Sequence, residues 1–346
     1  MDGWTRFIFM NLSEAQLGLF DVQMKGSSGL VEVYQSKKGT PLAELDFLVS
    51  ARSLVEKVGD EIPWLIEDLI PKGAIVMLGG ESTAGKSSMA KEFCLRLLNG
   101  DEEVLGKKLN PMFKSILYVS SEDGEYPTGI VIKNQIKAVA GFEVASLDAL
   151  HLIFDTHKIN VKISAALNAM PVDLIVIDSM GDFLSGNMNQ TNTVRSDLDF
   201  YSKIINRYPN TSVLFVHHTG KGKEANLPSK NNFLGSQGIE AKMRVVMELK
   251  KGKEDLRSLH IVKSNYSSDP KISDPIFMRM TQFQTYELSE PFELRSEKKK
   301  DDRIEKIAIA KQLKGQGLTL NEISNEMTSR GYADCGKSAI GNWLKQ

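Results

Sequence analysis

Short apolar runs alternate with longer segments of mixed polarity between about residue 60 and residue 285. Runs this short and this continuously apolar are typical of strands buried on both faces, and the segments between them can supply crossover helices. The pattern predicts an α/β fold with a mainly parallel, doubly wound sheet. The runs are "AIVML" (74–78), "SILYVS" (115–120), "DLIVID" (173–178), "SVLFVH" (212–217), "RVVMEL" (244–249) and "LHIVK" (259–263).

The regions on either side of this core follow different patterns. Residues 1–50 are weakly patterned and predict a small N-terminal appendage before a core domain at 51–290. The charged stretch "RSEKKKDDR" predicts a solvated linker at 291–303. Residues 304–346 predict three short helices, and "TLNE" has the spacing of a capping box at the start of the second.

Composition and charge narrow the class of protein. The 346 residues are 41% hydrophobic and 25% charged, as in ordinary globular proteins. The net charge of -1 means that any contact with nucleic acid must come from local patches. Cys94 and Cys335 form no disulfide framework and no metal-ligand pattern, which fits a reducing compartment. With no secretion-signal pattern and no run of 18 apolar residues, we expect a cytoplasmic protein without a membrane partner.

The stretch "GESTAGKS" directly follows the first apolar run and matches G-x-x-x-x-G-K-[ST]. Glycines let such a loop curl so that its backbone N–H groups point at phosphate, with the positive end of the next helix behind them. Lys86 would reach the β- and γ-phosphates and the Ser87 hydroxyl would ligate Mg²⁺, so ATP and Mg²⁺ are the expected cofactors. The expected nucleotide-binding residues are Gly80, Glu81, Ser82, Thr83, Ala84, Gly85, Lys86, Ser87 and Ser88.

Carboxylates follow two further strands of the predicted sheet. Asp178 ends the run "DLIVID" and is expected to hold the metal through water. Glu122 follows the run "SILYVS", where it could polarise a water for in-line attack on the γ-phosphate. Asp123 is the alternative base, and a plain acidic turn is the structural alternative for both.

Two histidines end the run "SVLFVH". Adjacent strand residues point to opposite faces, so one of His217 and His218 is expected to face the nucleotide and to contact the γ-phosphate. A zinc site is excluded because no further Cys or His lies at ligand spacing.

Taken together, the segments "PWLIEDLIPKGAIVMLGGESTAGKSS", "ILYVSSEDGE", "LIVIDSMGDFLSGNMNQ", "VLFVHHTGKG", "FLGSQGIEAKMRVVMEL" and "LHIVKSN" resemble the RecA-like ATPases of the plasmid RepA replicative helicase type, the AAA_25 group. The resemblance covers about residues 50–285. It implies a ring, commonly a hexamer, with ATP at subunit interfaces and single-stranded DNA in the pore. It also implies the roles of the site residues: phosphate and metal binding by Lys86 and Ser87, water activation by Glu122, the Walker B carboxylate at Asp178, and γ-phosphate sensing by His217 or His218.

Ring ATPases of this kind supply a cation to the γ-phosphate from the neighbouring subunit. The family tends to have an arginine directly before the Gly–Ser that matches Gly235 and Ser236, but this chain has Leu234 there. The departure leaves the trans-acting residue open. Arg244 and Lys263 are the candidates, with Arg244 preferred, and ordinary solvation at strand ends is the alternative for both.

Two long loops, 181–197 and 219–238, lack periodicity and are rich in Gly and Asn. Loops of this length in a compact core are usually functional or disordered. Lys221, Lys223 and Lys230 in the second could contact phosphates if a ring repeats the patch, which makes them the candidate nucleic-acid residues. A solvated surface loop is the alternative.

The C-terminal helices have the order of a helix-turn-helix, with "LTLNEISNEM" as the supporting helix and "GKSAIGNWLKQ" as the recognition helix. Duplex DNA is then a second expected partner, while a helical bundle that caps the ring or recruits a partner is the alternative. The connection "TSRGYADC" is longer than the usual turn. In this arrangement Trp343 and Leu344 face the core, and the outward residues are Lys337, Ser338 and Asn342.

Three functions fit this sequence. The first is an ATP-hydrolysing ring motor, specifically a replicative DNA helicase of a plasmid, phage or integrated element. The second is an ATP-dependent recombination mediator that forms filaments on DNA. The third is a DNA-binding regulator gated by nucleotide.

Overall fold

The computed structural model describes residues 6–8, 20–24, 32–36, 48–110, 112, 115–183, 191–220, 226–233, 241–267 and 270–345. The chain divides into two units, Met1–Glu61 and Ile62–Gln346. The first unit therefore extends beyond residue 50, where the sequence placed the start of the core.

The first unit contains a small antiparallel sheet in the order β1-β3-β2, formed by β1 (Arg6–Ile8), β2 (Phe20–Met24) and β3 (Glu32–Ser36). Helix α2 (Ala51–Lys57) follows, and the Ser50 side chain caps it by accepting a hydrogen bond from the backbone N–H of Ser53. Leu54 and Val55 of this helix are exposed.

The second unit is built on one large sheet. Within the described residues it has nine strands in the order β10-β9-β11-β12-β6-β13-β14-β15-β16. The strands from β10 to β13 are parallel, and β14 to β16 are added antiparallel. Their bounds are β6 (Ile75–Gly80), β9 (Ile116–Ser120), β10 (Leu150–Ile153), β11 (Leu174–Asp178), β12 (Ser212–His218), β13 (Val245–Lys251), β14 (Leu256–Ser264), β15 (Ile276–Met280) and β16 (Tyr286–Leu288).

All six predicted strands are present, and the mainly parallel α/β fold is confirmed. The sequence did not predict the direction of β14, which pairs antiparallel with β13 because only a short turn connects them. The sequence did not predict β10, β15 or β16. Two short hairpins were also not predicted: β4 (Trp64–Ile66) with β5 (Ile70–Pro71), and β7 (Glu103–Val104) with β8 (Lys107–Lys108).

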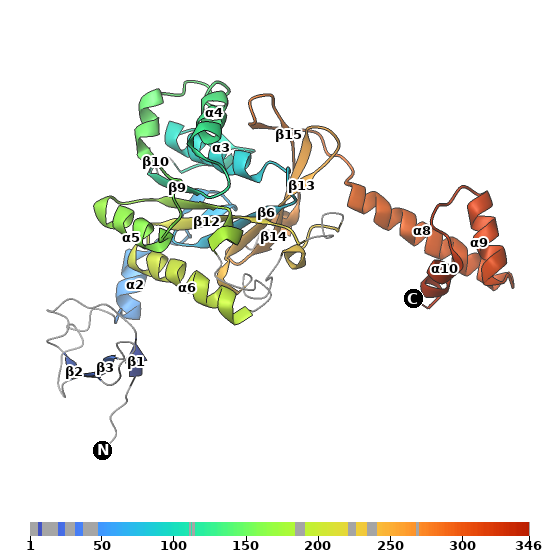
Figure 1. The fold of residues 1–346 in the computed structure, drawn as a ribbon, viewed down its shortest axis with the longest axis horizontal. Coiled ribbons are helices and arrows are strands. Elements are labelled where there is room, and N and C mark those ends of the chain that lie inside the picture. The colour runs from blue at the N-terminus through green and yellow to red at the C-terminus, as the bar shows by residue number, and fades with distance from the viewer. Residues whose placement is uncertain are drawn as a thin grey trace, which may run out of the picture. The chain divides into compact units, whose positions relative to one another are not determined.

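Helices cover both faces of this sheet (Figure 1). On one face α3 (Lys86–Asn99) packs on alternate strand residues such as Val76 and Val176, and α4 (Glu125–Gln135) lies beside it. On the other face α5 (Ile159–Ala169) and α6 (Thr191–Arg207) pack on the intervening residues, such as Met77 and Ile177. Short 3-10 helices occur at Val144–Ala149, Met180–Phe183, Lys230–Asn232 and Pro270–Ser273.

The alternation explains why the apolar runs are continuous, since successive side chains enter two separate cores. No helix in the described part of the chain is long and apolar enough to cross a membrane.

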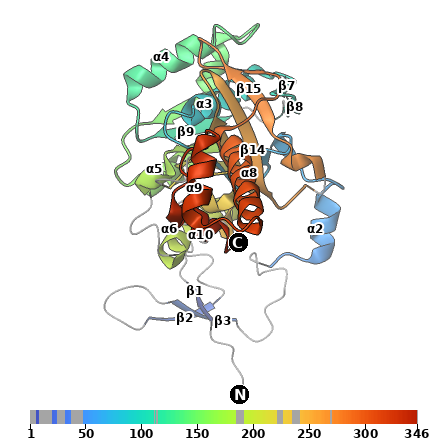
Figure 2. The same ribbon diagram turned by 90° about the vertical axis from the view of Figure 1, so that its right-hand side faces the viewer.

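Three helices close the chain: α8 (Arg295–Gly315), α9 (Leu320–Ser329) and α10 (Lys337–Trp343), which pack together in Figure 2. Their small core includes Leu313, Ile323 and Trp343. The capping box at the start of α9 is present, and the side chains predicted to face outward, Lys337, Ser338 and Asn342, are exposed.

The segment at 295–303 differs from the prediction of a linker, because it forms the first turns of α8. Lys, Arg and Glu favour the helical state, so a run of charge does not by itself indicate irregular backbone.

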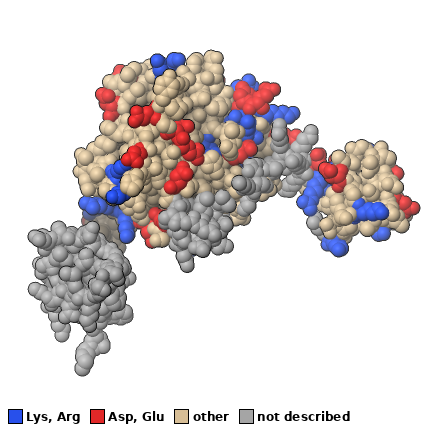
Figure 3. All heavy atoms as spheres, in the orientation of Figure 1, with Lys and Arg blue, Asp and Glu red and all other residues tan. Residues whose placement is uncertain are grey.

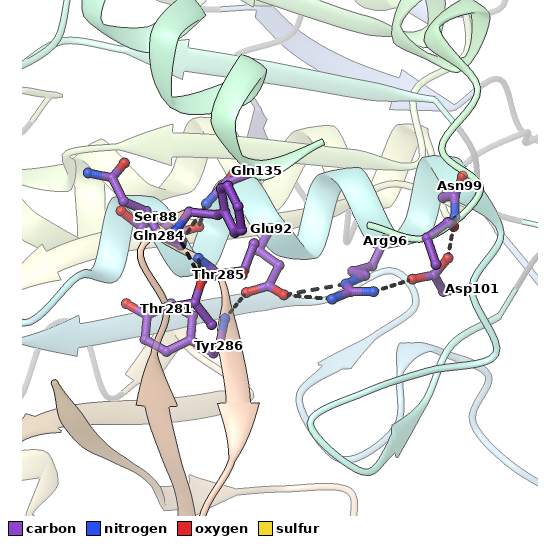
Figure 4. A network of polar contacts seen from close by, with 12 residues as sticks. Ser88, Glu92, Arg96, Asn99, Asp101, Gln135, Thr281, Gln284, Thr285 and Tyr286 are labelled. Atoms are coloured by element: carbon purple, nitrogen blue, oxygen red, sulfur yellow. Dashed lines mark hydrogen bonds and ion pairs between the residues drawn. The ribbon is translucent and has the colours of Figure 1, made fainter. Parts of the chain in front are cut away.

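Helix α3 is held in place by polar contacts with the start of β16, and α4 is bonded both to α3 and to the turn before β16 (Figure 4). The Glu92 carboxylate, 1% exposed, accepts hydrogen bonds from the Tyr286 backbone N–H at 2.8 Å and from the Arg96 guanidinium. Gln135 of α4 donates its side-chain amide to the carbonyl oxygens of Ser88 and Gln284, both at 2.8 Å. The helix that begins at the phosphate-binding loop is therefore fixed to two neighbouring elements.

The buried Glu92 carboxyl group should make the stability of the protein depend on pH. Burial, opposed by Arg96, raises its pKa from 4.5 to about 7. The native chain therefore keeps a proton that the unfolded chain has released, so the contribution of Glu92 to stability is complete below pH 4.5 and is lost as pH rises through about 7. We expect the stability of the wild type relative to Glu92→Gln to fall by roughly 1 to 3 kcal/mol between pH 5 and pH 8.

Thermal unfolding across this range measures the change, with Glu102→Gln, at an exposed position, as the control for the substitution. A difference between wild type and Glu92→Gln that is constant or grows with pH contradicts the prediction.

Candidate nucleotide-binding site

The loop between β6 and α3 curls through backbone conformations that favour glycine. Gly85 has φ +99°, and a Cβ there would lie 2.0 Å from the Tyr286 hydroxyl. That hydroxyl donates to the Gly85 carbonyl oxygen at 2.8 Å, and the buried Arg257 Nε donates to the carbonyl oxygen of Ala84 at 2.8 Å. The carbonyl groups of the loop are thus held from behind, which leaves the N–H groups at the start of α3 available for phosphate.

Lys86, the first residue of α3, is buried among acceptors. Its Nζ donates to the Glu81 carbonyl oxygen at 2.9 Å and lies 3.3 Å from Nδ1 of His218. Burial lowers the Lys86 pKa to about 8, and the negative charges of Asp178 and Glu122 partly oppose the shift. The ammonium lies where it can exchange these contacts for phosphate oxygens.

Ser87 and Asp178 meet across the edge of the sheet. The Ser87 hydroxyl donates to Oδ1 of Asp178 at 3.1 Å, while Oδ2 accepts the Tyr118 hydroxyl at 2.5 Å. Burial and the adjacent Asp178 raise the pKa of Tyr118 well above its ordinary value, so its hydroxyl remains a donor.

This pair fits Mg²⁺, which prefers oxygen ligands and takes its remaining ones from water and phosphates. When bound, the ion would neutralise charge on the β- and γ-phosphates. Among the described residues there is no group of three or more His, Cys, Asp or Glu that could hold a metal alone.

His218 links the phosphate-binding lysine to the candidate base. Its Nε2 lies 3.0 Å from Oε1 of Glu122, and its Nδ1 faces Lys86. Because an ammonium can only donate, Nδ1 is the acceptor and Nε2–H donates to the carboxylate. Partial burial acts to raise the Glu122 pKa, but the hydrogen bonds from His218 and Ser179 and the nearby Lys86 ammonium outweigh it and lower the pKa. Glu122 is thus ionised, as a general base must be.

The other two candidates at these strand ends lie apart from this chain of contacts. Asp123 turns toward Lys91 of α3, at 3.8 Å between Oδ2 and Nζ. His217 is buried on the opposite face of β12 beside the Phe233 ring, with 6.3 Å between ring centroids.

The segment at 226–233 after β12 is anchored to the sheet. The Phe233 ring fills the space beside Gly79, where a Cβ would lie 2.0 Å from a ring carbon. The buried Glu248 carboxylate accepts hydrogen bonds from the Ser229 backbone N–H at 2.8 Å and from the Asn232 side-chain amide at 3.0 Å. Lys230 lies in this anchored segment, whereas Lys221 and Lys223 lie outside the described residues.

Arg244 and Lys263 lie at the opposite end of the sheet from the phosphate-binding loop. The Arg244 backbone N–H donates to Ile75 at the start of β6, and Lys263 Nζ donates to the Met243 carbonyl oxygen at 2.9 Å. Arg244 lines a hollow of about 460 Å³ with Arg195 and Lys242. Leu234, Gly235 and Ser236 lie outside the described residues.

Four residues that support the site were not predicted from the sequence: Lys91, Tyr118, Arg257 and Tyr286. Two of them carried a detectable signal, because Tyr118 interrupts the apolar run "SILYVS" and Lys91 lies on the core-facing side of an amphipathic helix. Arg257 and Tyr286 come from distant strands and had none.

Arg257 generates a prediction about nucleotide binding. Replacement by Met keeps the aliphatic stem but removes the donors to Ala84 and to the carbonyl oxygens of Glu254 and Leu256. We expect Arg257→Met to weaken ADP binding about tenfold, because the loop loses its support. Calorimetric titration measures this, with the exposed Arg279→Met as control. A lower Tm with unchanged affinity would mean that Arg257 serves the fold and not the loop.

A model of the AAA domain family AAA_25 matches residues 40–224, which is more than half of the chain. The crystal structure of the RadB recombinase aligns with 63% of this chain and 92% of its own, at 17% identity and a TM-score of 0.45. No curated protein matches the chain in sequence. The chain belongs to the AAA_25 family of AAA domains, the group of P-loop ATPases that its motifs resemble.

Proposed function

We propose that this P-loop ATPase is a ring motor on nucleic acid, specifically a replicative DNA helicase of a plasmid, phage or integrated element. The observation that carries the proposal is the chain of contacts from Lys86 through His218 to Glu122. His218 is the last residue of β12, and the segment expected to contact nucleic acid begins directly after it. A change at the γ-phosphate therefore has a short route to that segment.

In the proposed reaction, the N–H groups at the start of α3 and the Lys86 ammonium bind the β- and γ-phosphates. Glu122 accepts a proton from water as the water oxygen bonds to the γ-phosphorus, and the bond from that phosphorus to the bridging oxygen breaks to release ADP. Phosphate competes with His218 for Lys86. When Lys86 binds phosphate, His218 loses Lys86 as its partner at Nδ1. The contact between His218 Nε2 and Glu122 therefore differs between the states with and without the γ-phosphate.

A ring of subunits would give a role to the two candidate trans-acting cations, which lie far from the phosphate-binding loop of their own chain. Arg244 and Lys263 are remote from the nucleotide of their own chain, but a head-to-tail interface brings the far side of one subunit to the phosphate-binding loop of the next. A homohexamer in which Arg244 completes the neighbouring site is therefore part of the proposal.

Contacts with nucleic acid would come from local groups of basic residues and not from the overall charge of the chain. On the face shown in Figure 3, the described basic and acidic residues are interspersed, which matches the net charge of -1. Single-stranded DNA is assigned to the stretches at 181–197 and 219–238, with Lys221, Lys223 and Lys230 as phosphate contacts. The first stretch is not a loop throughout, as the sequence predicted, because α6 begins at Thr191. Duplex DNA is assigned to the exposed side of α10.

ATPase measurements with and without single-stranded DNA test the motor. We expect Lys86→Ala and Glu122→Gln each to lower kcat by about 10² or more, because one removes a phosphate contact and the other the base. Lys133→Met, at an exposed position on α4, is the control. DNA-stimulated hydrolysis in closed hexamers with strand displacement supports the helicase.

Other outcomes favour the alternatives. Filaments whose length follows the DNA, with annealing or exchange, favour a recombination mediator. Duplex binding that depends on residues 304–345 and not on the central loops favours a regulator. Hydrolysis that survives Lys86→Ala would contradict the site itself.

Mixed oligomers test the trans-acting residue. Arg244→Ala and Glu122→Gln should each be inactive alone. A mixture should recover activity, because some interfaces then combine an intact Arg244 with an intact Glu122. The same mixture with Lys263→Ala is the matched comparison. Recovery with Lys263→Ala and not with Arg244→Ala would reassign the role to Lys263.

A further inference from the structure

Lys91 places a charge where helix α3 otherwise contacts the core. Its side chain is 3% exposed, and Met89, Ala90, Phe93 and Cys94 around it are fully buried. Burying an ammonium is costly unless opposite charge lies close by. Lys91 Nζ lies 3.8 Å from Oδ2 of Asp178, 3.8 Å from Oδ2 of Asp123, and 5.1 Å from the centre of the Tyr118 ring.

The two oxygens of Asp178 are used differently. Oδ1 accepts the Ser87 hydroxyl and is on the side of the phosphate-binding loop, whereas Oδ2 accepts the Tyr118 hydroxyl and faces Lys91. Lys91 therefore acts on this carboxylate from behind, without occupying the oxygen that faces the metal position.

Asp123 and Asp178 follow neighbouring strands. Ser120 pairs with Asp178 in the register of β9 and β11, so the loop from Ser121 to Asp123 starts directly beside the Walker B strand end. Glu122 lies in this loop, immediately before Asp123. Two carboxylates this close to one ammonium would repel each other without it.

We propose that Lys91 is a positioning residue for ATP hydrolysis: its ammonium bridges Asp178 and Asp123 and thereby fixes the loop that carries Glu122 relative to the metal-facing carboxylate. This inference rests on the proposed ATPase chemistry. Lys91 acts through the two carboxylates, because its ammonium faces Oδ2 of Asp178 and Oδ2 of Asp123. Its removal leaves the phosphate-binding loop intact, but repulsion between the two carboxylates displaces Glu122.

The test is a double-mutant cycle in the full chain. The variants are Lys91→Met, which keeps the stem and removes the charge, Asp123→Asn, and the two combined, with Lys133→Met as control. Steady-state ATPase gives kcat and KM, and thermal unfolding without nucleotide gives Tm.

We expect Lys91→Met to lower kcat by at least about tenfold with KM changed less than about threefold, because a misplaced base affects the chemical step and not binding. Adding Asp123→Asn should restore kcat at least about threefold and raise Tm relative to Lys91→Met alone, because the repulsion is removed. Loss of packing alone predicts no such rescue. Lys91→Gln replaces Lys91→Met if the latter yields no folded protein.

Effects that simply add in both kcat and Tm would overturn the proposal, as would a Lys91→Met variant that raises KM at unchanged kcat. The measurements distinguish failure of the proposed function from failure of the proposed role of Lys91. A wild type that binds ADP but hydrolyses no ATP removes the proposed function, and rescue in Tm alone would then leave the bridge as a purely structural unit and overturn its role in hydrolysis.

Discussion

The hydrogen bond from Ser87 to Asp178 joins the phosphate-binding loop to a strand that is not its neighbour, because β12 lies between β6 and β11. It forms only if the parallel strands β6, β12 and β11 keep the register that brings Ser87 and Asp178 together. Their register pairs Gly80 with His218 and Val216 with Asp178. A slip of one residue would turn every side chain on a strand to the opposite face and separate the serine from the carboxylate. The continuous apolar runs that fix this register are thus also what assembles the site.

The antiparallel strands have a different part in the architecture. Strand β14 sends Arg257 to the loop carbonyl oxygen of Ala84, and β16 begins with Tyr286, which contacts Gly85 through its hydroxyl and Glu92 through its backbone. These contacts replace the solvent that would otherwise surround the back of a Gly-rich loop. The parallel half of the sheet therefore positions the candidate reacting groups, and the antiparallel half supports the conformation of the loop.

The sequence predicted the elements whose local pattern is strong and the residues that a motif names. Strand β10 was not predicted from the sequence, and most of its side chains are only partly buried. The direction of β14 was not predicted because an apolar run does not encode strand direction. Glu122 and Asp123 were left as alternatives, since spacing places both at the strand end. In the structure the two have different partners, because Glu122 contacts His218 and Asp123 contacts Lys91, and these partners come from different elements. Such contacts are not visible in a one-dimensional pattern.

The anchor formed by Phe233, Asn232 and Glu248 divides the stretch that follows β12. The described segment 226–233 is therefore already ordered against β6 and β13, so no further conformational entropy is lost there when a ligand binds. Lys230 belongs to this segment, and the sheet thus fixes the backbone position of that lysine relative to His218, the residue that ends β12.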